Sequence, residues 1–448
     1  MLRPEDFGAR GDGVTNDTPA FAALSAEVNR RGGGTVSFAP GRTYVVGAQA
    51  RGGSYGWTPS PILELRNLRS ALRILGNGAR LRCQPGLRFG VFDLRSGRSL
   101  RRPMPNYRQN EIASPYRAMI DISGARASIE IRDLELDGNL ERLQLGGPYG
   151  DTGWQIPASG ILLVDNRGPE IVANVLSHHH GQDGAMINGD DRRSARSSFT
   201  RFVARHNGRQ GLSLVGGRGY DFEDCEFSHT GRSAITSAPG AGVDIEAEGR
   251  KTIRELSFTR CRFADNYGVG LLADSGDSEG ARFADCQFIG TTGWSAWPSK
   301  PRFAFDNCTF VGAVTSPYAD RDPARATRFT GCRFTDDPSL SPAGRVFPGE
   351  PAPGGAIVNL PQSDNVLFDR CTFDVSGTAV LPWSWKALYR DCTMRQRSAR
   401  TAMTKGKYLG STTISGPVDL YGSMVVGNLT VNGRRIPPGP VGGDVRPW

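Results

Sequence analysis

The histidine-rich stretch SHHHGQD, residues 177–183, holds three of the chain's five histidines. The other two, His206 and His229, follow within about 50 residues. Imidazole side chains can bind a metal ion, transfer protons in catalysis, or simply satisfy hydrogen bonds. Spacing alone does not distinguish these roles, so the choice depends on the elements that position the side chains.

Carboxylates form the second set of residues that could do chemistry. Asp183 ends the histidine-rich stretch, and Asp244 and Glu246 follow in the alternating segment GVDIEAE. Alternation puts Asp244 and Glu246 on the same face of a strand, about 7 Å apart. Paired carboxyl groups can act as general acid and general base. These three residues are therefore the candidate catalytic residues, and a solvated acidic row on an exposed sheet face is the alternative.

A repeat, aromatic-x-x-Cys-x-aromatic, organises the elements around these residues. Its cysteines recur roughly every 22–25 residues in the regular copies. Repeats of this length with two-residue alternation indicate a solenoid of β-strands, in which equivalent positions of successive coils stack about 4.8 Å apart. We predict an all-β fold, a right-handed parallel β-helix with repeats over roughly 120–395. The copies are FEDCEF (222–227), FTRCRF (258–263), FADCQF (283–288), FDNCTF (305–310), FTGCRF (329–334), FDRCTF (368–373) and YRDCTM (389–394), with IVANVL (171–176) and FTRFVA (199–204) lacking the cysteine.

The cysteines of the repeat are expected to be structural. No CxxC motif occurs among the eight cysteines of the chain. Alternation turns the repeat cysteines toward the interior, where a thiol behaves as a small apolar side chain. A ladder of buried free thiols is favoured over disulfides or a metal site.

The N-terminal segment predicts a cap for the solenoid. A short amphipathic helix is expected over about 18–30, beginning at Thr18-Pro19 and ending at Gly32. Such a helix would cover the open edge of the first coil. The expected parts of the chain are a cap at 1–50, a parallel β-helix at 51–400 with loop insertions at about 95–118, 146–158 and 230–241, and a C-terminal cap or oligomerisation segment at 401–448.

Composition limits the partners. The net charge is +9, with arginines clustered at 95–108, but no aromatic-basic recognition motif supports nucleic acid as a partner. A solvated loop is favoured for this cluster over a docking site for an acidic polymer. No run of 18 apolar residues indicates a membrane span. The N-terminus has no apolar signal segment, and an extracellular or periplasmic location is favoured if such a segment has been removed.

Aligning the coils assigns the histidines to a turn. One turn position of four successive coils is expected to hold His178, His206, His229 and Asp265. A structural ladder of turn residues is favoured there over substrate contacts, and a metal site is the weakest alternative, because a linear stack lacks convergent ligands with an oriented second shell. His179 and His180 fall outside this ladder. On the following strand the equivalent residues are expected to be Asp183, Gln210, Ala241 and Tyr267, and further along Met186, Ser213, Asp244 and Gly270.

The N-terminal string DFGARGDGVTNDTPAF, together with the coil repeat, resembles the pectate-lyase-like superfamily of polygalacturonases, lyases, epimerases and phage tailspikes. The resemblance covers most of the chain and implies the β-helix fold, a polysaccharide or oligosaccharide partner and, by analogy with tailspikes, a homotrimer. It indicates fold more firmly than activity.

The polygalacturonase motifs NTDG, DD, GHG and RIK match this chain only in part. Asp183 resembles the family's general acid. Ser159 and Gly184 replace the carboxylates that activate water, and Gln210 stands where the histidine would be. Acidic residues replace the arginine and lysine that hold a uronate. The matched segments are Ala158-Ser159-Gly160, Gln182-Asp183-Gly184, Arg209-Gln210-Gly211 and Asp244-Ile245-Glu246.

These departures favour a glycoside hydrolase other than a polygalacturonase. Asp183 would protonate the glycosidic oxygen, and Asp244 or Glu246 would activate water. Stacking places Asp183 and Asp244 two coils and about 9–10 Å apart, near the upper end for an inverting pair. Residues expected to bind substrate are His180, His206, Arg209, Gln210, Ser213, Tyr267, Tyr149, Trp154 and Trp294.

Two other functions stay open, and no cofactor is expected for any of them. A lyase or C5-epimerase acting on a uronate polymer would use cations and a base drawn from His180, His206, Arg209 and Tyr267. A non-catalytic, tailspike-like glycan-binding protein is the third. No metal is expected at the site, although the carboxylates nearby are of the kind that bind Ca²⁺: Asp190, Asp191, Glu248 and Asp274.

Overall fold

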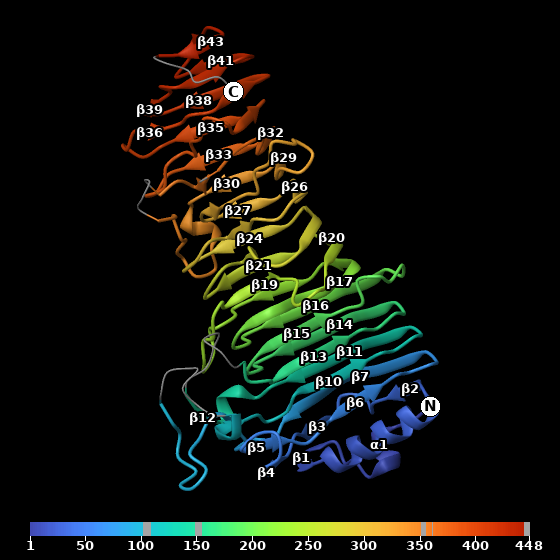
Figure 1. Ribbon diagram of the computed structural model, residues 1–448. Coiled ribbons are helices and arrows are strands. Elements are labelled where there is room, and N and C mark those ends of the chain that lie inside the picture. The colour runs from blue at the N-terminus through green and yellow to red at the C-terminus, as the bar shows by residue number, and fades with distance from the viewer. Residues whose placement is uncertain (102–108, 148–154, 351–354, 361, 443–448) are drawn as a thin grey trace. The chain divides into compact units, whose positions relative to one another are not determined.

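The computed structural model describes residues 1–101, 109–147, 155–350, 355–360 and 362–442. These residues form two compact units, the first made of 1–244 and 248–252 and the second of 245–247 and 253 onward. Each unit is built of short parallel strands that stack coil upon coil (Figure 1). The expected β-helix is therefore confirmed, whereas the domain boundaries expected near 50 and 400 stay predictions.

In the first unit, two rows of parallel strands carry the coils. One long strand, β17 (Gln210–Glu223), belongs to both rows: its N-terminal half pairs in the second row and its C-terminal half in the first. The first row contains β2 (Gly34–Ser37), β3 (Thr43–Val46), β7 (Leu72–Cys83), β11 (Ile129–Asp137), β14 (Glu170–His178), β16 (Ser197–Arg205), β18 (Glu226–Ser228) and, at its edge, β1 (Asp12–Asn16). The second row contains β6 (Leu63–Arg66), β10 (Ala118–Ser123), β13 (Ser159–Val164), β15 (Asp183–Asn188), β17 (Gln210–Glu223) and β19 (Ala241–Ile245).

Insertions in the first unit form a small separate sheet and two 3₁₀ turns. The sheet consists of β4 (Gln49–Arg51), β5 (Trp57–Pro59), β8 (Arg88–Val91), β9 (Ile112–Ala113) and β12 (Gln144–Gly146). The turns are η2 (Gln109–Glu111) and η3 (Leu140–Arg142).

The second unit repeats the same coil with shorter strands. One row contains β20 (Ile253–Thr259), β23 (Ser278–Ala284), β26 (Ala304–Asp306), β29 (Arg328–Thr330), β32 (Leu367–Asp369), β34 (Leu388–Arg390), β37 (Lys407–Leu409) and β40 (Ser423–Val425). The next contains β21 (Arg262–Asn266), β24 (Gln287–Gly290), β27 (Thr309–Val311), β30 (Arg333–Thr335), β33 (Thr372–Val375), β35 (Thr393–Gln396), β38 (Ser411–Ser415) and β41 (Asn428–Val431). The third contains β22 (Leu271–Ala273), β25 (Ala296–Pro298), β28 (Val314–Thr315) and β31 (Val358–Asn359), and η4 (Pro338–Leu340) lies in a turn.

Parallel stacking continues beyond the last cysteine of the repeat. Tyr408 on β37 pairs in register with Tyr389 on β34, and β41 pairs with β38. The stack ends in two antiparallel pairings, β42 (Arg434–Ile436) on β41 and β43 (Gly439–Val441) on β40. A separate pair is formed by β36 (Ala402–Met403) and β39 (Val418–Asp419).

Aromatic ladders fill the core of the second unit. Each coil places one ring directly over the equivalent ring of the coil before it, because the strands pair in register. Phe310, for example, stacks on Phe288 at 4.8 Å and on Phe334 at 4.9 Å, with interplanar angles of 8° and 5°. It also meets Phe305 and Phe329 edge to face. Such ring pairs add about 0.5–1.5 kcal/mol each beyond the burial of apolar area.

The eight cysteines are free and buried, which confirms the expected thiol ladder. From Cys286 onward, each repeat thiol is held by a carbonyl of the preceding coil. Cys308 Sγ donates to the Phe283 carbonyl at 3.5 Å, and Cys332 Sγ donates to that of Phe305 at 3.3 Å. The thiol therefore satisfies its weak donor while it occupies an apolar position.

The expected N-terminal helix is present as α1 (Thr18–Arg31), preceded by the 3₁₀ turn η1 (Pro4–Phe7). It ends at Gly32, whose φ of +72° suits glycine. Phe21 of α1 packs against Phe38 and Tyr44, with ring centroids 5.8 and 5.6 Å away. The helix thus closes the first coil, as Figure 1 shows at the N-terminal end. Within the described ranges, no helix is both long and apolar enough to cross a membrane.

Removing one ring from the ladder should destabilise the protein strongly. We expect Phe310→Ala to lower the free energy of unfolding by about 3–5 kcal/mol, because the cavity lies between two stacked neighbours and cannot collapse. Urea unfolding measures this change. Met403→Ala, at a side chain 45% exposed, is the control and should change stability by less than about 0.5 kcal/mol. Equal effects of the two substitutions on the free energy of unfolding would show that the aromatic ladder does not stabilise the core.

Candidate active site on the second row of strands

The second row of strands in the first unit presents one continuous line of outward side chains. Glu64 pairs with Asp121, Asp121 with Leu162, Leu162 with Met186 and Met186 with Ser213. Their neighbours along each strand, such as Ile120 and Ile122 on β10, are fully buried in the core. We call these five residues the outer line. Asp244 lies on β19, which pairs with the last of these strands, β17.

In β13, β15 and β17 a polar first residue is followed by a glycine that faces the interior, so alternation places the polar residue on the outer side. A Cβ on Gly184 would lie 2.8 Å from Cβ of Ala204 and 2.7 Å from the Asn207 amide, so this position faces the interior. Asp183, directly before it, consequently faces the outer side and reaches Ser213. Asp183 pairs with Gln210 on β17, which confirms the predicted register of these two coils.

Asp183 is a fully buried carboxyl group with few compensating contacts. Ser213 Oγ donates to its Oδ2 at 2.8 Å, and Arg209 Nη1 lies 3.8 Å from its Oδ1. Among the described residues, Oδ1 accepts no hydrogen bond. Burial raises the pKa of Asp183 to about 6, although Arg209 and Ser213 favour the charged form. A carboxyl group tuned in this way can hold a proton in weakly acidic solution and donate it.

Gln210 connects this carboxyl group to the second one. Its side-chain amide donates to Asp244 Oδ2, and its carbonyl oxygen accepts from Arg209 Nη1 at 2.9 Å. Arg209 therefore lies between Asp183 and Gln210, and Gln210 between Arg209 and Asp244. The structure brings together five residues that the sequence predicted for the site, all of them buried: Asp183, Arg209, Gln210, Ser213 and Asp244. We call these residues the carboxylate cluster.

Insertion residues lie beside the cluster and leave little space there. A cavity of about 10 Å³, enough for about one water molecule, is lined by Gln182 and Arg209. Its other walls come from Phe89, Gly181 and the insertion residues Gln155, Ile156 and Ser237. On the next coil Ser159 Oγ donates to Gln182 Oε1 at 3.0 Å. Ser159, which the resemblance to polygalacturonases placed at the position of a carboxylate, thus belongs to a hydrogen-bonded wall.

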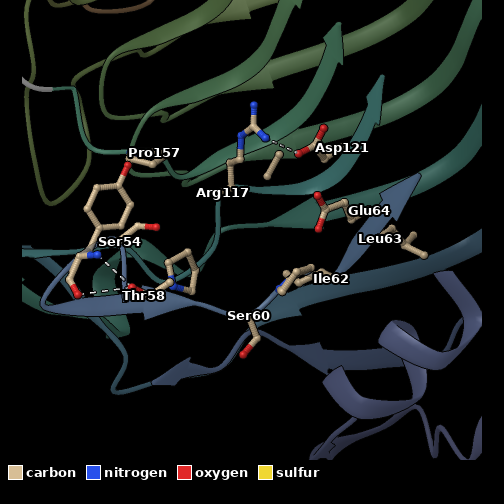
Figure 2. Close-up of a pocket in the computed structure, with 13 residues that line it drawn as sticks. Ser54, Thr58, Ser60, Ile62, Leu63, Glu64, Arg117, Asp121 and Pro157 are labelled. Atoms are coloured by element: carbon tan, nitrogen blue, oxygen red, sulfur yellow. Dashed lines mark hydrogen bonds and ion pairs between the residues drawn. The ribbon is translucent and has the colours of Figure 1, made fainter. Parts of the chain in front are cut away.

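A larger open pocket of about 290 Å³ lies at the other end of the outer line (Figure 2). Asp121 in its wall forms a bidentate pair with Arg66, at 2.6 and 2.8 Å, and a longer contact of 3.3 Å with Arg117. Tyr55 also lines the pocket, and the segment 58–61, with Thr58, Pro59, Ser60 and Pro61, completes it. The sequence analysis missed this pocket, although the polar residues alternating with apolar ones in LELR and MIDI mark outward positions.

Three predicted site residues belong to the second unit. Glu246 accepts a hydrogen bond from Ser275 Oγ at 2.7 Å. Tyr267 is 51% exposed, and Trp294 packs edge to face on Phe347 at 5.0 Å. Their participation in one site with the carboxylate cluster stays a prediction. Tyr149 and Trp154 lie outside the described residues.

His180 lies in the core. It is fully buried, and its Nδ1 is 2.8 Å from the hydroxyl of Tyr116, which is itself fully buried. Burial holds the pKa of His180 well below its usual range. The ring is therefore neutral and packed inside the coil, where no substrate reaches it without unfolding.

The histidine ladder exists, but its first member is His179 instead of the predicted His178. His179 stacks on His206 with ring centroids 5.0 Å apart, and His206 stacks on His229 at 4.8 Å. The reason is a one-residue error in aligning IVANVL: Val172 pairs with Phe199, so the copy begins at 172. All three histidines of the stack have a left-handed backbone, and burial lowers the pKa of His206 to about 4.

Replacing Asp183 should change how stability depends on pH. Between pH 4 and 6 the unfolded chain ionises this carboxyl group while the folded protein keeps its proton, so the folded state loses stability as pH rises. Asp183→Asn removes this loss. The difference in free energy of unfolding, variant minus wild type, should grow by about 3 kcal/mol from pH 4 to pH 7, since one pKa unit corresponds to about 1.4 kcal/mol. Urea unfolding at a series of pH values measures it, and a difference that is constant with pH would contradict the buried carboxyl.

Comparison with known proteins agrees with the fold. A family model described as a right-handed β-helix region matches residues 118–310. The chain is a right-handed parallel β-helix, as the sequence predicted. No curated protein matches the sequence.

Several solved structures share the coil arrangement at low identity. The A-module of the Azotobacter vinelandii mannuronan C-5 epimerase AlgE4 is 16% identical, with a TM-score of 0.48, over 95% of this chain and 99% of that one. The tailspike gp49 of Acinetobacter baumannii bacteriophage Fri1, a capsular polysaccharide depolymerase, is 14% identical, with a TM-score of 0.40, over 98% of this chain and 64% of that one. PfbA, a surface adhesin of Streptococcus pneumoniae, is 12% identical, with a TM-score of 0.38, over 96% and 90%. Likeness at this level says nothing about the reaction of this chain.

Proposed function

We propose that the protein is a glycoside hydrolase that binds a glycan along the outer line and cleaves it at the carboxylate cluster. The observation that carries the proposal is the environment of Asp183, a buried carboxyl group with a pKa of about 6 that is linked through Arg209 and Gln210 to a second carboxylate, Asp244. Carboxyl groups with displaced pKa values and specific charged partners gather at catalytic sites.

The two carboxylates have environments suited to different roles. Asp183 keeps its proton in weakly acidic solution and would donate it to the glycosidic oxygen. Asp244 accepts a hydrogen bond from the Gln210 amide and would act as the base that activates water. The two strands that carry them are separated by β17, so the strands lie about 9–10 Å apart. The Gln210 side chain lies between the two carboxyl groups and would have to move to make room for the water that an inverting pair requires. This arrangement would invert the anomeric configuration.

The outer line offers the kind of surface that an extended sugar chain needs. Leu162 and Met186 give an apolar strip between two polar ends, Asp121 with its arginines at one end and Ser213 at the other. Leu162, Asp121 and Ser213 are buried, so the residues that cover them would have to move when a glycan binds. The open pocket adds the ring of Tyr55 next to hydroxyl and carboxylate groups, a combination that binds both the apolar face and the hydroxyls of a sugar. The glycan would therefore occupy this pocket and the cluster together.

Substrate binding requires the insertions beside the cluster to move. Asp183 is fully buried, and the cavity next to Arg209 holds no more than about one water molecule. A glycan would have to displace Gln155, Ile156 and Ser237 from the wall of this cavity. Amide hydrogen exchange around these residues should then change when glycan binds, while that of the second-unit core strands stays constant.

A lyase or epimerase acting on a uronate polymer is the second candidate, and Arg209 favours it. This guanidinium is buried, and among the described residues its Nε has no hydrogen-bond acceptor. Arg209 could neutralise the carboxylate of a uronate bound next to Asp183. The Asp183 carboxylate would then remove the C5 proton of that uronate. A product with a new C=C bond absorbs in the ultraviolet, whereas a hydrolysis product carries only a new reducing end.

A panel of neutral and acidic polysaccharides, assayed for reducing ends and for unsaturated product, tests both candidates. Asp183→Asn should lower turnover by about 10²–10⁴-fold, the usual contribution of a general acid, and wild-type activity should decline as pH rises through about 6. Asp221→Asn, at an exposed ion pair with Arg196 on the first row, is the matched control and should keep full activity. Full activity of both Asp183→Asn and Asp244→Asn would rule out the proposed site, and turnover on no glycan would favour a binding protein.

A further inference from the structure

A second constellation of ligand-type side chains lies on the first row of strands, away from the carboxylate cluster. Asp137, His178 and His179 each place a nitrogen or oxygen in one small region, with these atoms all within 4.8 Å of one another. His178 Nδ1 lies 2.6 Å from His179 Nδ1 and 3.8 Å from Asp137 Oδ1. Two imidazole nitrogens and a carboxylate oxygen are a common ligand set for divalent transition metal ions.

The coil arrangement holds these three residues together. Asp137 ends β11 and pairs in register with His178, which ends the adjacent strand β14. His179 follows in a left-handed turn with φ of +53°, and the His206 ring stacked on it fixes its ring plane. The ligands therefore come from a rigid strand pair and a fixed turn, which limits the rearrangement that binding requires.

An outer hydrogen bond orients the central ligand. Glu135 Oε1 lies 3.0 Å from His178 Nε2, and Arg80 Nε holds the same carboxylate at 2.9 Å. A carboxylate at Nε2 keeps the ring proton on that nitrogen, which leaves the lone pair on Nδ1, in the region that the three residues share. Such carboxylate–histidine pairs support metal-binding histidines in many proteins.

We propose that Asp137, His178 and His179 form a binding site for one divalent transition metal ion of the zinc class. Water would complete the coordination, because the side chains of His178 and Asp137 are 12% and 14% exposed. In the metal-free geometry the two Nδ1 atoms share a proton. Binding releases that proton from His179 Nδ1 to water, and His179 takes up a proton on Nε2 in exchange, so that both rings stay neutral. The separation of the two Nδ1 atoms widens to about 3.3 Å, as ligand bonds of about 2.0–2.1 Å in a tetrahedral site require.

The bound ion would link two successive coils, β11 and β14, near the turn that begins the histidine stack. Asp137 Oδ1 also accepts a hydrogen bond from the backbone N–H of Asn139 at 2.9 Å, and a carboxylate oxygen has lone pairs for both partners. From the sequence a metal was the weakest alternative, because a linear stack of turn residues lacks convergent ligands with an oriented second shell. The corrected register supplies the convergent ligands and the outer carboxylate that a linear stack lacks.

Calorimetric titration of the untagged full-length chain with Zn²⁺, and with Co²⁺ followed by visible absorption, tests the site. We expect one equivalent to bind, with Co²⁺ bands of a four- or five-coordinate N/O site and a rise in melting temperature with Zn²⁺. His178→Ala and Asp137→Asn should each abolish stoichiometric binding, and His179→Asn, which tolerates the left-handed backbone, should do the same. Glu135→Gln should weaken binding about 10–100-fold.

His229→Asn is the matched control, because His229 has the same backbone conformation and belongs to the same histidine stack, where it adjoins His206. It should bind Zn²⁺ like the wild type. The absence of stoichiometric binding in the wild type would overturn the proposal, as would binding that survives His178→Ala together with Asp137→Asn. A thiolate charge-transfer band with Co²⁺ would place the ion on cysteine and would overturn it as well.

Discussion

Parallel strands that pair in register, one coil above another, are the constraint on which the rest of the structure depends. The spacing of about 4.8 Å between strands also suits stacked aromatic rings. The same geometry therefore allows both the hydrogen bonds between strands and the stacking of rings in the core. Phe263, Phe288, Phe310, Phe334 and Phe373 stack at 4.5–4.9 Å in consequence. The same spacing brings each repeat thiol from Cys286 onward to a carbonyl of the coil before it.

The constraint also explains how a regular fold can hold irregular chemistry. Outward positions lie outside the stacked interior of the coil, so the residue type can vary there from coil to coil, as it does from Glu64 to Ser213 along the outer line. Because neighbouring coils are held rigidly at fixed spacing, residues far apart in sequence meet with defined geometry. In this way Ser213 donates a hydrogen bond to Asp183, and Gln210 donates one to Asp244.

The fold could be predicted from the sequence because its signal is periodic. The cysteine repeat and the end of the helix at Gly32 depend on local patterns, and both agree with the structure. The site could be predicted only in part.

The register of Asp183 with Gln210 followed from the glycines that mark the starts of their strands. IVANVL, by contrast, contains two adjacent apolar residues, Ile171 and Val172, that fit the first position of the repeat equally well. Choosing the wrong one shifted His178 into the place of His179. The burial of His180 beside Tyr116 depends on a contact across 64 residues, which no local pattern reveals.

The aromatic ladder makes the coils of the second unit nearly interchangeable. Phe310 meets the same kind of ring below and above, so a coil inserted or lost between such rungs would leave every remaining ring with an equivalent neighbour. A lineage could thus lengthen or shorten this unit in steps of one coil without redesigning its interior. The carboxylate cluster does not tolerate the insertion or loss of a coil. Asp183, Gln210 and Asp244 differ from one another, and each must lie on its own coil in this sequence of strands. Variation in copy number would therefore be tolerated among the phenylalanine coils and excluded between β15 and β19.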